Sequence, residues 1–138
     1  GLTWDYVTEM ETEGISETTL RILPDETMVA LIRPRWIGVS KPPYRKWTYS
    51  DIGQGIGGPN FIRLPDGALW AAGRKYGDQT RTSLARMTPT SFEHVLELPS
   101  GGDTCYPGMA WYKNELWMSY YSSHEGGKTS IFLAKIKL

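Results

Sequence analysis

The chain has 138 residues, which suffices for one domain with a hydrophobic core and is too short for two. Its 15 basic and 15 acidic side chains cancel, which argues against a nucleic-acid-binding protein, and no apolar run of about 18 residues predicts a membrane span. With one cysteine, Cys105, and two histidines, His94 and His124, an internal disulfide is excluded and a zinc site is not expected, so we predict no metal and no cofactor.

The expected strands recur in the same order three times along the chain. The first strands of the three copies lie at 18–23, 60–64 and 109–112. Each runs into a turn, Pro-Asp-Glu, Pro-Asp-Gly or Lys-Asn-Glu, whose residue types suit tight corners. The second strands lie at 27–33, 68–74 and 116–121, and the third strands are centred on Gly38, Ala85 and Ala134. No segment has the apolar period and the caps of a helix, so we predict an all-β fold.

Two stretches of the sequence match at an offset of 41 residues. Residues 23–33 read Leu-Pro-Asp-Glu-Thr-Met-Val-Ala-Leu-Ile-Arg, and residues 64–74 read Leu-Pro-Asp-Gly-Ala-Leu-Trp-Ala-Ala-Gly-Arg. A weaker third copy repeats the Leu-Trp of 69–70 at 116–117, an offset of 47. Such a period matches the four-stranded blade of a β-propeller. A β-sandwich or a small barrel also has short, regularly spaced strands, but the blade-length repeat favours the propeller.

The repeat predicts three blades, near 13–55, 56–100 and 101–138, with 1–12 as the last strand of a preceding blade. The opening Gly-Leu-Thr-Trp resembles the second half of an Asp box, Ser-x-Asp-x-Gly-x-Thr-Trp, which is a structural turn between the outer strands of sialidase-type blades. Residues 40–47 keep only the Ser and the Trp of that box. Because the chain opens inside such a turn, we expect it to be the C-terminal part of a longer protein.

Over essentially its whole length the chain resembles the sialidase superfamily. The most specific stretches are 15–20, 57–67, 102–108 and 120–126. The resemblance implies a sialidase-like β-propeller, of which this chain holds about three four-stranded blades out of six. It also implies a glycoside hydrolase whose ligand is a carbohydrate, a sialylated glycan in the family.

The resemblance further implies the residues of an active site. Tyr106 would be the nucleophile, because a carboxylate would be repelled by the carboxylate of sialic acid, and Glu17 would take its proton. Arg33 and Arg74 would clamp the substrate carboxylate, since the guanidinium fork suits bidentate contact. Asp103 does not stand in a context that matches the family, but it precedes the tyrosine strand and would on that ground be a further ligand contact. The acid/base Asp and the third Arg of the family would lie in blades outside this chain.

Each of these residues also has a plain structural interpretation. An arginine at a strand end is more often solvated or ion-paired. The offset of 41 residues that Arg33 and Arg74 share favours a role for both in the site. Glu17 would then be a surface residue and Tyr106 a packed aromatic. Other notable residues are expected to be structural: Cys105 as a small buried side chain, Trp70, Trp111 and Trp117 in the inter-blade core, and His124 and Glu125 in a turn.

Two hypotheses about function remain from the sequence. In the first, the chain is a sialidase-like glycosidase or a fragment of one, cleaving a terminal acidic sugar with retention. In the second, it is a non-catalytic glycan-binding or scaffold half-propeller that closes by homodimerisation into a six-bladed ring. The segment 3–8 would then complete the last blade of the partner. The sequence leaves the compartment open, and a secreted or periplasmic parent is compatible with the resemblance.

Overall fold

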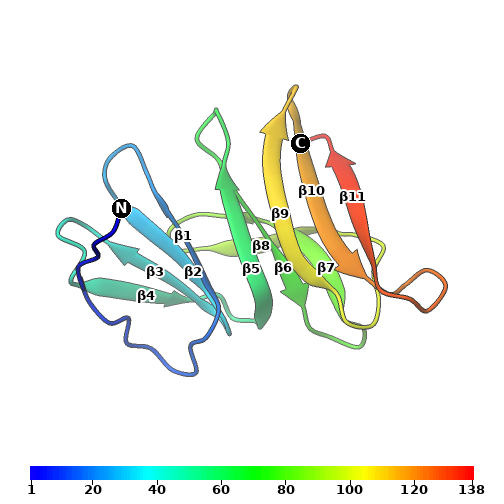
Figure 1. Cartoon of the computed structure of the whole chain (residues 1–138), viewed down its shortest axis with the longest axis horizontal. Coiled ribbons are helices and arrows are strands. Elements are labelled where there is room, and N and C mark those ends of the chain that lie inside the picture. The colour runs from blue at the N-terminus through cyan, green and yellow to red at the C-terminus, as the bar shows by residue number, and fades with distance from the viewer.

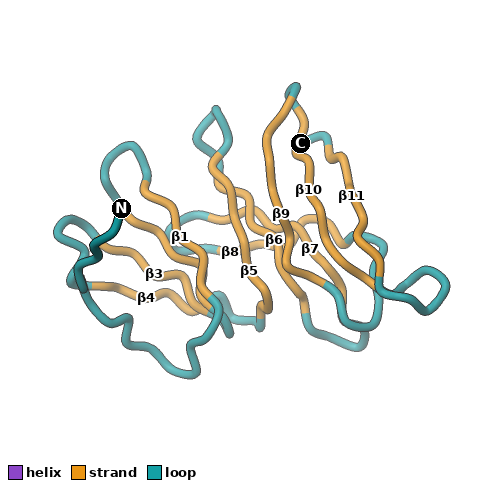
Figure 2. Tube along the Cα trace, in the orientation of Figure 1, coloured by secondary structure: helices purple, strands orange, loops and turns teal.

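The computed structural model describes residues 1–138 as eleven strands without a helix (Figures 1 and 2). All pairings are antiparallel, and the strands form three sheets in the orders β1-β2-β3-β4, β5-β6-β7-β8 and β11-β10-β9. No helix is therefore long and apolar enough to cross a membrane. The strand bounds are β1 Thr18–Ile22, β2 Met28–Ile32, β3 Trp36–Ser40, β4 Trp47–Asp51, β5 Ile56–Arg63, β6 Leu69–Lys75, β7 Arg81–Met87, β8 Phe92–Glu97, β9 Cys105–Tyr112, β10 Glu115–Ser122 and β11 Ser130–Ile136.

The all-β class and the turn chemistry predicted from the repeat are confirmed. At the β1–β2 turn the Asp25 carboxylate accepts a hydrogen bond from the Thr27 N–H at 3.2 Å, and at the β5–β6 turn Asp66 accepts one from the Ala68 N–H at 2.9 Å. These side-chain bonds close the turn locally. The same chemistry at two positions 41 residues apart explains why the turns were readable from the sequence.

Two first strands begin earlier than predicted, β5 at Ile56 and β9 at Cys105. Glycine and proline at the start of β5 are typical of a loop, yet Gly57 pairs with Arg74 across the sheet. The register then shifts between Gly57 and Asn60, which is a bulge that absorbs the irregular residues. These early residues matter because they carry the candidate site.

The prediction of four strands in every blade is wrong for the third sheet, which has only β9, β10 and β11. Residues 1–12, expected to be a strand, form none. A strand needs a neighbouring edge to satisfy its N–H and C=O groups, and this segment pairs with no edge in the chain. Its apolar side chains Leu2, Trp4 and Tyr6 are exposed.

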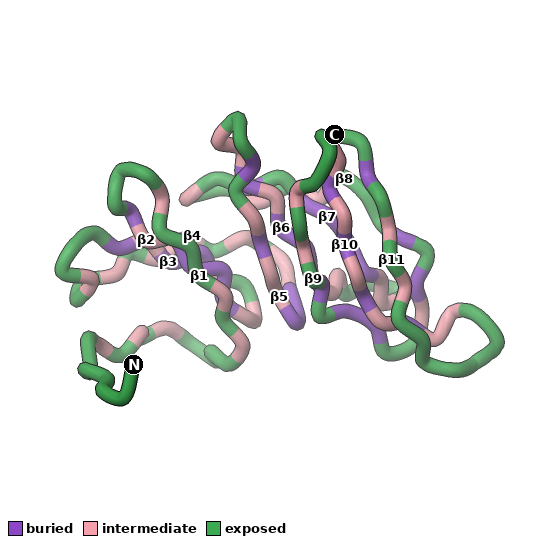
Figure 3. The backbone as a smooth tube through the Cα atoms, turned by 45° about the horizontal axis from the view of Figure 1, so that its top comes forward, coloured by how far each residue is buried: buried purple, intermediate pink, exposed green.

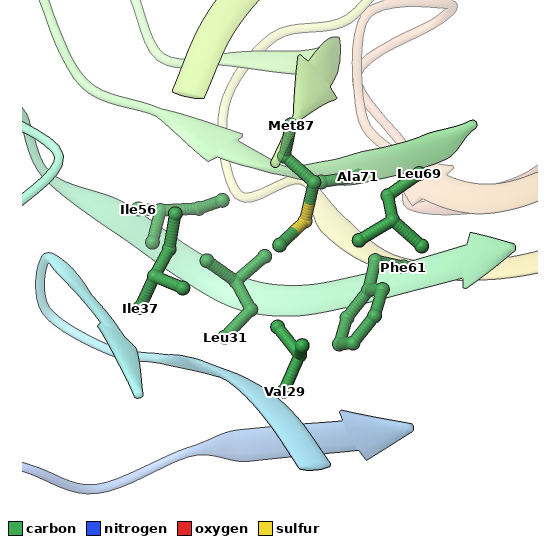
Figure 4. Close-up of a cluster of buried hydrophobic side chains, with 8 residues drawn as sticks. All are labelled: Val29, Leu31, Ile37, Ile56, Phe61, Leu69, Ala71 and Met87. Carbon is green, nitrogen blue, oxygen red and sulfur yellow. The ribbon is translucent and has the colours of Figure 1, made fainter. Parts of the chain in front are cut away.

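The core consists of two apolar clusters, one on each face of the middle sheet. Because side chains alternate along a strand, Leu69 and Ala71 of β6 face the first sheet while Trp70 and Ala72 face the third. The first cluster is shown in Figure 4 and contains Val29, Leu31, Ile37, Ile56, Phe61, Leu69, Ala71 and Met87. The second joins β6 and β7 to β10 and contains Ala72, Leu84, Leu98, Leu116, Met118, Tyr120 and Ile136. The three sheets therefore pack face to face in succession.

The first strands β1, β5 and β9 lie next to one another across the molecule (Figure 1). Asn60 of β5 links them: its Oδ1 accepts from Thr19 Oγ1 at 3.3 Å and its Nδ2 donates to the Pro107 carbonyl at 2.8 Å. These bonds join positions that are 41 and 47 residues apart, which are the offsets of the repeat. Equivalent positions of neighbouring sheets thus meet along the inner strands.

Candidate active site at the start of the inner strands

Tyr106 occupies a strained position at the start of β9. Its φ is +50°, and Cys105 before it has a φ of +147°. The inner strand β5 approaches closely here, because Gly58 adopts a φ of +52° and a Cβ at that position would lie 3.2 Å from both Cys105 Sγ and the Tyr106 nitrogen. Only glycine combines this conformation with this approach. The Tyr106 ring is left 58% exposed.

Cys105 is fully buried beside the tyrosine, as predicted for a small apolar residue. Its thiol donates to the Gly57 carbonyl at 3.1 Å, which helps hold β9 against β5. Burial raises the pKa of the Cys105 thiol to about 12, so the side chain stays protonated.

Glu17, just before β1, receives hydrogen bonds from three segments. Its Oε1 accepts the hydroxyl hydrogen of Tyr106, 89 residues away, and forms an ion pair with Arg33 Nη1 at 3.2 Å. Its Oε2 accepts the Gly58 N–H at 2.7 Å. The Tyr106 hydroxyl is the main reason that the pKa of Glu17 falls below 4.5, with burial opposing and Gly58 and Arg33 assisting.

The same contact acts on the tyrosine in the opposite sense. The hydrogen bond to Glu17, and then its negative charge, raise the pKa of Tyr106 above 10.0, while Arg74 and Arg33 act to lower it. At neutral pH the pair is therefore a phenol donating to a carboxylate. A carboxylate so placed is a ready acceptor for the phenol proton.

Arg74, near the end of β6, is the centre of a second group of contacting residues, next to the group of Glu17, Arg33 and Tyr106. Its Nε donates to the Thr104 carbonyl at 2.8 Å, and its Nη2 contacts Asp103 Oδ1 at 2.5 Å and the Tyr121 hydroxyl at 3.0 Å. The Tyr121 ring stacks on Tyr106 with centroids 6.0 Å apart and planes 19° from parallel. This stack connects the Arg74 group to the Glu17 group.

The five residues named from the sequence thus lie in two adjoining groups: Glu17, Arg33 and Tyr106 in one, Arg74 and Asp103 in the other. The sequence analysis missed Tyr121. Its signal was present, because Tyr121 lies 47 residues after Arg74, the offset at which Trp117 repeats Trp70. The two arginines are not free, since each is paired with a carboxylate of the chain.

Two of the three tryptophans expected in the inter-blade core are found there. Trp70 and Trp111 pack against the second cluster from its edge. Trp117 lies on the outer face of the third sheet, with Ile131 and Leu133, because Leu116 and Met118 on either side of it face the middle sheet. There its ring lies edge-on to Tyr112, with centroids 6.5 Å apart. No other sheet of this chain covers that face, so the inter-blade position of Trp117 stays a prediction. His124 bonds Ser122 Oγ at 2.9 Å, as befits a structural turn residue.

A cleft of about 420 Å³ lies elsewhere, between the β5–β6 turn and the β9–β10 turn. It is lined by Trp70, Trp111, Arg86 and Asp66 among others, at the opposite ends of β5 and β9 from Tyr106. No carboxylate there is hydrogen-bonded to a potential nucleophile, whereas Glu17 and Tyr106 form such a pair. We therefore place the candidate site at Tyr106. No cluster of His, Cys, Asp and Glu in the structure is arranged to hold a metal.

No protein-family model and no curated protein matches the sequence. Solved structures do match. An α-L-arabinofuranosidase from Fusarium graminearum, in complex with an iminosugar inhibitor, superposes with a TM-score of 0.73 at 15% identity, over 89% of this chain and 45% of that one. An α-L-arabinanase from Penicillium chrysogenum, complexed with arabinobiose, superposes with a TM-score of 0.70 at 16% identity. The match covers 89% of this chain and 46% of the arabinanase. An endo-1,4-β-xylanase from Bacteroides thetaiotaomicron superposes with a TM-score of 0.64 at 14% identity, and the match covers 88% of this chain and 50% of the xylanase.

These similarities establish the fold: the chain is built like part of a β-propeller of the kind found in glycoside hydrolases. It spans about half the length of the structures it matches. None of these three is a sialidase, so the propeller class is supported and the sialidase type stays a prediction. The total number of blades and the blade boundaries also stay predictions.

Proposed function

We propose that the chain forms part of the active site of a β-propeller glycoside hydrolase, with Tyr106 and Glu17 as its reactive pair. The observation that carries this proposal is the hydrogen bond from the Tyr106 hydroxyl to the Glu17 carboxylate, formed by residues 89 positions apart. A phenol beside a carboxylate at an open face of the inner strands has the components of an activated nucleophile. The likeness to an arabinofuranosidase and an arabinanase supports a carbohydrate ligand.

In the proposed reaction the Tyr106 oxygen attacks the anomeric carbon while its proton passes to Glu17. The bond from the anomeric carbon to the leaving oxygen breaks, and an acid outside this chain protonates that oxygen. Water then hydrolyses the glycosyl–tyrosine: the group that protonated the leaving oxygen, now deprotonated, takes a proton from the water, and protonated Glu17 returns its proton to the departing Tyr106 oxygen. The two displacements retain the anomeric configuration. The raised pKa of Tyr106 means that the proton leaves during the attack and not before it.

Two sugar classes are supported by different observations. The sialidase resemblance implies a terminal acidic sugar, whose carboxylate Arg33 and Arg74 would bind. Two of the similar structures were solved with an iminosugar inhibitor and with arabinobiose, and arabinobiose is a neutral sugar. The glycosidase proposal depends on the Tyr106–Glu17 pair and holds for either class.

The test uses 4-nitrophenyl glycosides, because nitrophenolate departs without help from an acid and the reaction can proceed on this chain alone. We expect the chain to release nitrophenolate from at least one of the 4-nitrophenyl α-L-arabinofuranoside, β-xyloside and α-sialoside, with a glycosyl adduct on Tyr106 detectable by mass spectrometry. Tyr106→Phe removes only the hydroxyl and should abolish both signals. Tyr112→Phe is the matched control, since Tyr112 lies on the same strand and is 56% exposed against 58% for Tyr106. Equal release by Tyr106→Phe and the unmodified chain would refute the proposal.

A second function is favoured by the third sheet. That sheet has three strands, and Ile131 and Leu133 on its outer face are 76% and 66% exposed. A glycan-binding or scaffold half-propeller that covers this face with a second copy fits these facts. It would bind a glycan without forming an adduct on Tyr106, and the mass spectrum separates it from the catalytic proposal.

A further inference from the structure

The loop between β8 and β9 is built to bring the Asp103 carboxylate to Arg74. The next residue, Thr104, is fully buried, and its Oγ1 bonds both the Tyr121 carbonyl and Thr82 Oγ1 at 2.7 Å. Gly102 on the other side has a φ of +63°, and a Cβ there would overlap Ser123 Oγ. Thr104 thus ties the loop to β7 and β10 directly after an aspartate whose own side chain is 71% exposed.

Both arginines of the site are charge-balanced by this chain. Arg74 already uses Nε for the Thr104 carbonyl and Nη2 for Asp103 and Tyr121, and the Tyr76 hydroxyl also lies beside its guanidinium. Arg33 uses Nη1 for Glu17 and keeps Nε and Nη2. Two guanidinium charges meet two carboxylate charges, so the group carries no net charge to attract an anion.

Pairs of this kind match the chemistry of a hydroxyl group. A hydroxyl donates one hydrogen bond and accepts others, so it fits beside an arginine and a carboxylate at once. A carboxylate only accepts, and next to Arg74 it would meet the negative charge of Asp103 across a few ångströms. An anionic sugar that binds Arg74 would therefore have to displace Asp103 or lie against its negative charge.

We propose that the site takes neutral sugars and that Asp103 is the residue that excludes anionic ones. The inference rests on the proposed function for the ligand being a sugar. The exclusion itself rests on the Arg74–Asp103 contact and the anchored loop.

Asp103→Asn is the decisive variant, because its amide oxygen can still accept from Arg74 Nη2 while the charge is removed. The measurement is the ¹⁵N–¹H signal of Arg74 Nε in the full chain during titration with three probes: methyl α-L-arabinofuranoside, N-acetylneuraminic acid and acetate. In the unmodified chain we expect a response to the arabinoside and none to the two anions. In Asp103→Asn we expect both anions to bind, at least about tenfold more tightly than the detection limit that the unmodified chain sets. Asp66→Asn is the matched control: it removes one charge at the far end of β5 and should behave like the unmodified chain.

The outcomes separate the two proposals. If the unmodified chain prefers N-acetylneuraminic acid to the arabinoside, or if Asp103→Asn gains no affinity for either anion, the exclusion by Asp103 is wrong. If acetate binds only to Asp103→Asn and no sugar binds to any variant, the exclusion stands and the glycosidase proposal falls.

Discussion

At Glu17 a hydroxyl, a guanidinium and a backbone N–H, all from different segments, meet one carboxylate. Several hydrogen-bond donors around a carboxylate stabilise its charged form and lower its pKa. A hydroxyl that donates to the carboxylate is itself stabilised in its protonated form, so its pKa rises. The lowered pKa of Glu17 and the raised pKa of Tyr106 are two descriptions of this one contact. The pair is therefore poised for proton transfer in one direction, from Tyr106 to Glu17.

We predict that Glu17→Gln lowers the pKa of Tyr106. The variant removes the acceptor charge that raises this pKa above 10.0 and leaves Arg33 and Arg74, which act to lower it. ¹³Cζ-labelled tyrosine measured across an alkaline titration would show the change. Glu93→Gln, a charge loss on the outer strand β8, is the control. An unchanged Tyr106 titration in Glu17→Gln would contradict the contact.

The two shifts also define when the contact stabilises the fold. Glu17 has a depressed pKa, so its contribution is present above its unfolded value of 4.5 and is lost as the pH falls through the lower folded value. Tyr106 has a raised pKa, so its contribution is present below 10.0 and is lost as the pH rises through the higher folded value. Between these limits the contact is intact.

At the scale of elements, β5 decides whether the site exists. It is the inner strand of the middle sheet, and through Asn60 and Gly58 it touches the inner strands on both sides. Its bulge turns the Gly58 N–H toward Glu17 and allows β9 to approach. A regular strand with an alternating pattern would not make these contacts.

Gly58→Ala should destabilise the chain more than Gly53→Ala. Both glycines have left-handed φ values, +52° and +74°, so alanine costs about 1–2 kcal/mol of conformational energy at each. A Cβ at Gly53 meets nothing within 4 Å, whereas at Gly58 it meets Cys105 and the Tyr106 backbone at 3.2 Å. Urea unfolding of the two variants measures the difference. Equal losses would mean that the approach of β5 to β9 is not tight.

At the scale of the whole molecule, the third sheet leaves the apolar side chains of its outer face uncovered. The middle sheet is buried on both faces, while the outer face of the third sheet carries exposed Ile131 and Leu133. The strand that holds them, β11, is drawn mostly as exposed or intermediate in Figure 3. In a propeller each such face packs on the next blade. Exposed apolar area of this kind marks an interface.

We predict that the isolated chain self-associates through this face and that Leu133→Lys shifts it toward the monomer. A charge in the middle of the face makes its burial unfavourable. Light scattering measures the solution mass, which is compared with the 15.6 kDa of one chain. Lys128→Leu, in the exposed β10–β11 loop, is a control that changes charge outside the face. A monodisperse monomer before any substitution would show that the face does not self-associate.

The amino-acid sequence by itself determined the all-β class, the turns at Asp25 and Asp66 and most of the strand positions. These depend on alternation and turn chemistry within a few residues, and the repeat displays them more than once. The extra residues of β5 and β9 were missed, because a glycine- and proline-rich stretch is typical of a loop and pairs only when a neighbouring strand absorbs its bulge. The candidate residues could be named from the resemblance. That Glu17 and Tyr106 touch, and that Arg33 and Arg74 are already paired with carboxylates, was decided by the tertiary structure, because these contacts join segments brought together only when the sheets pack.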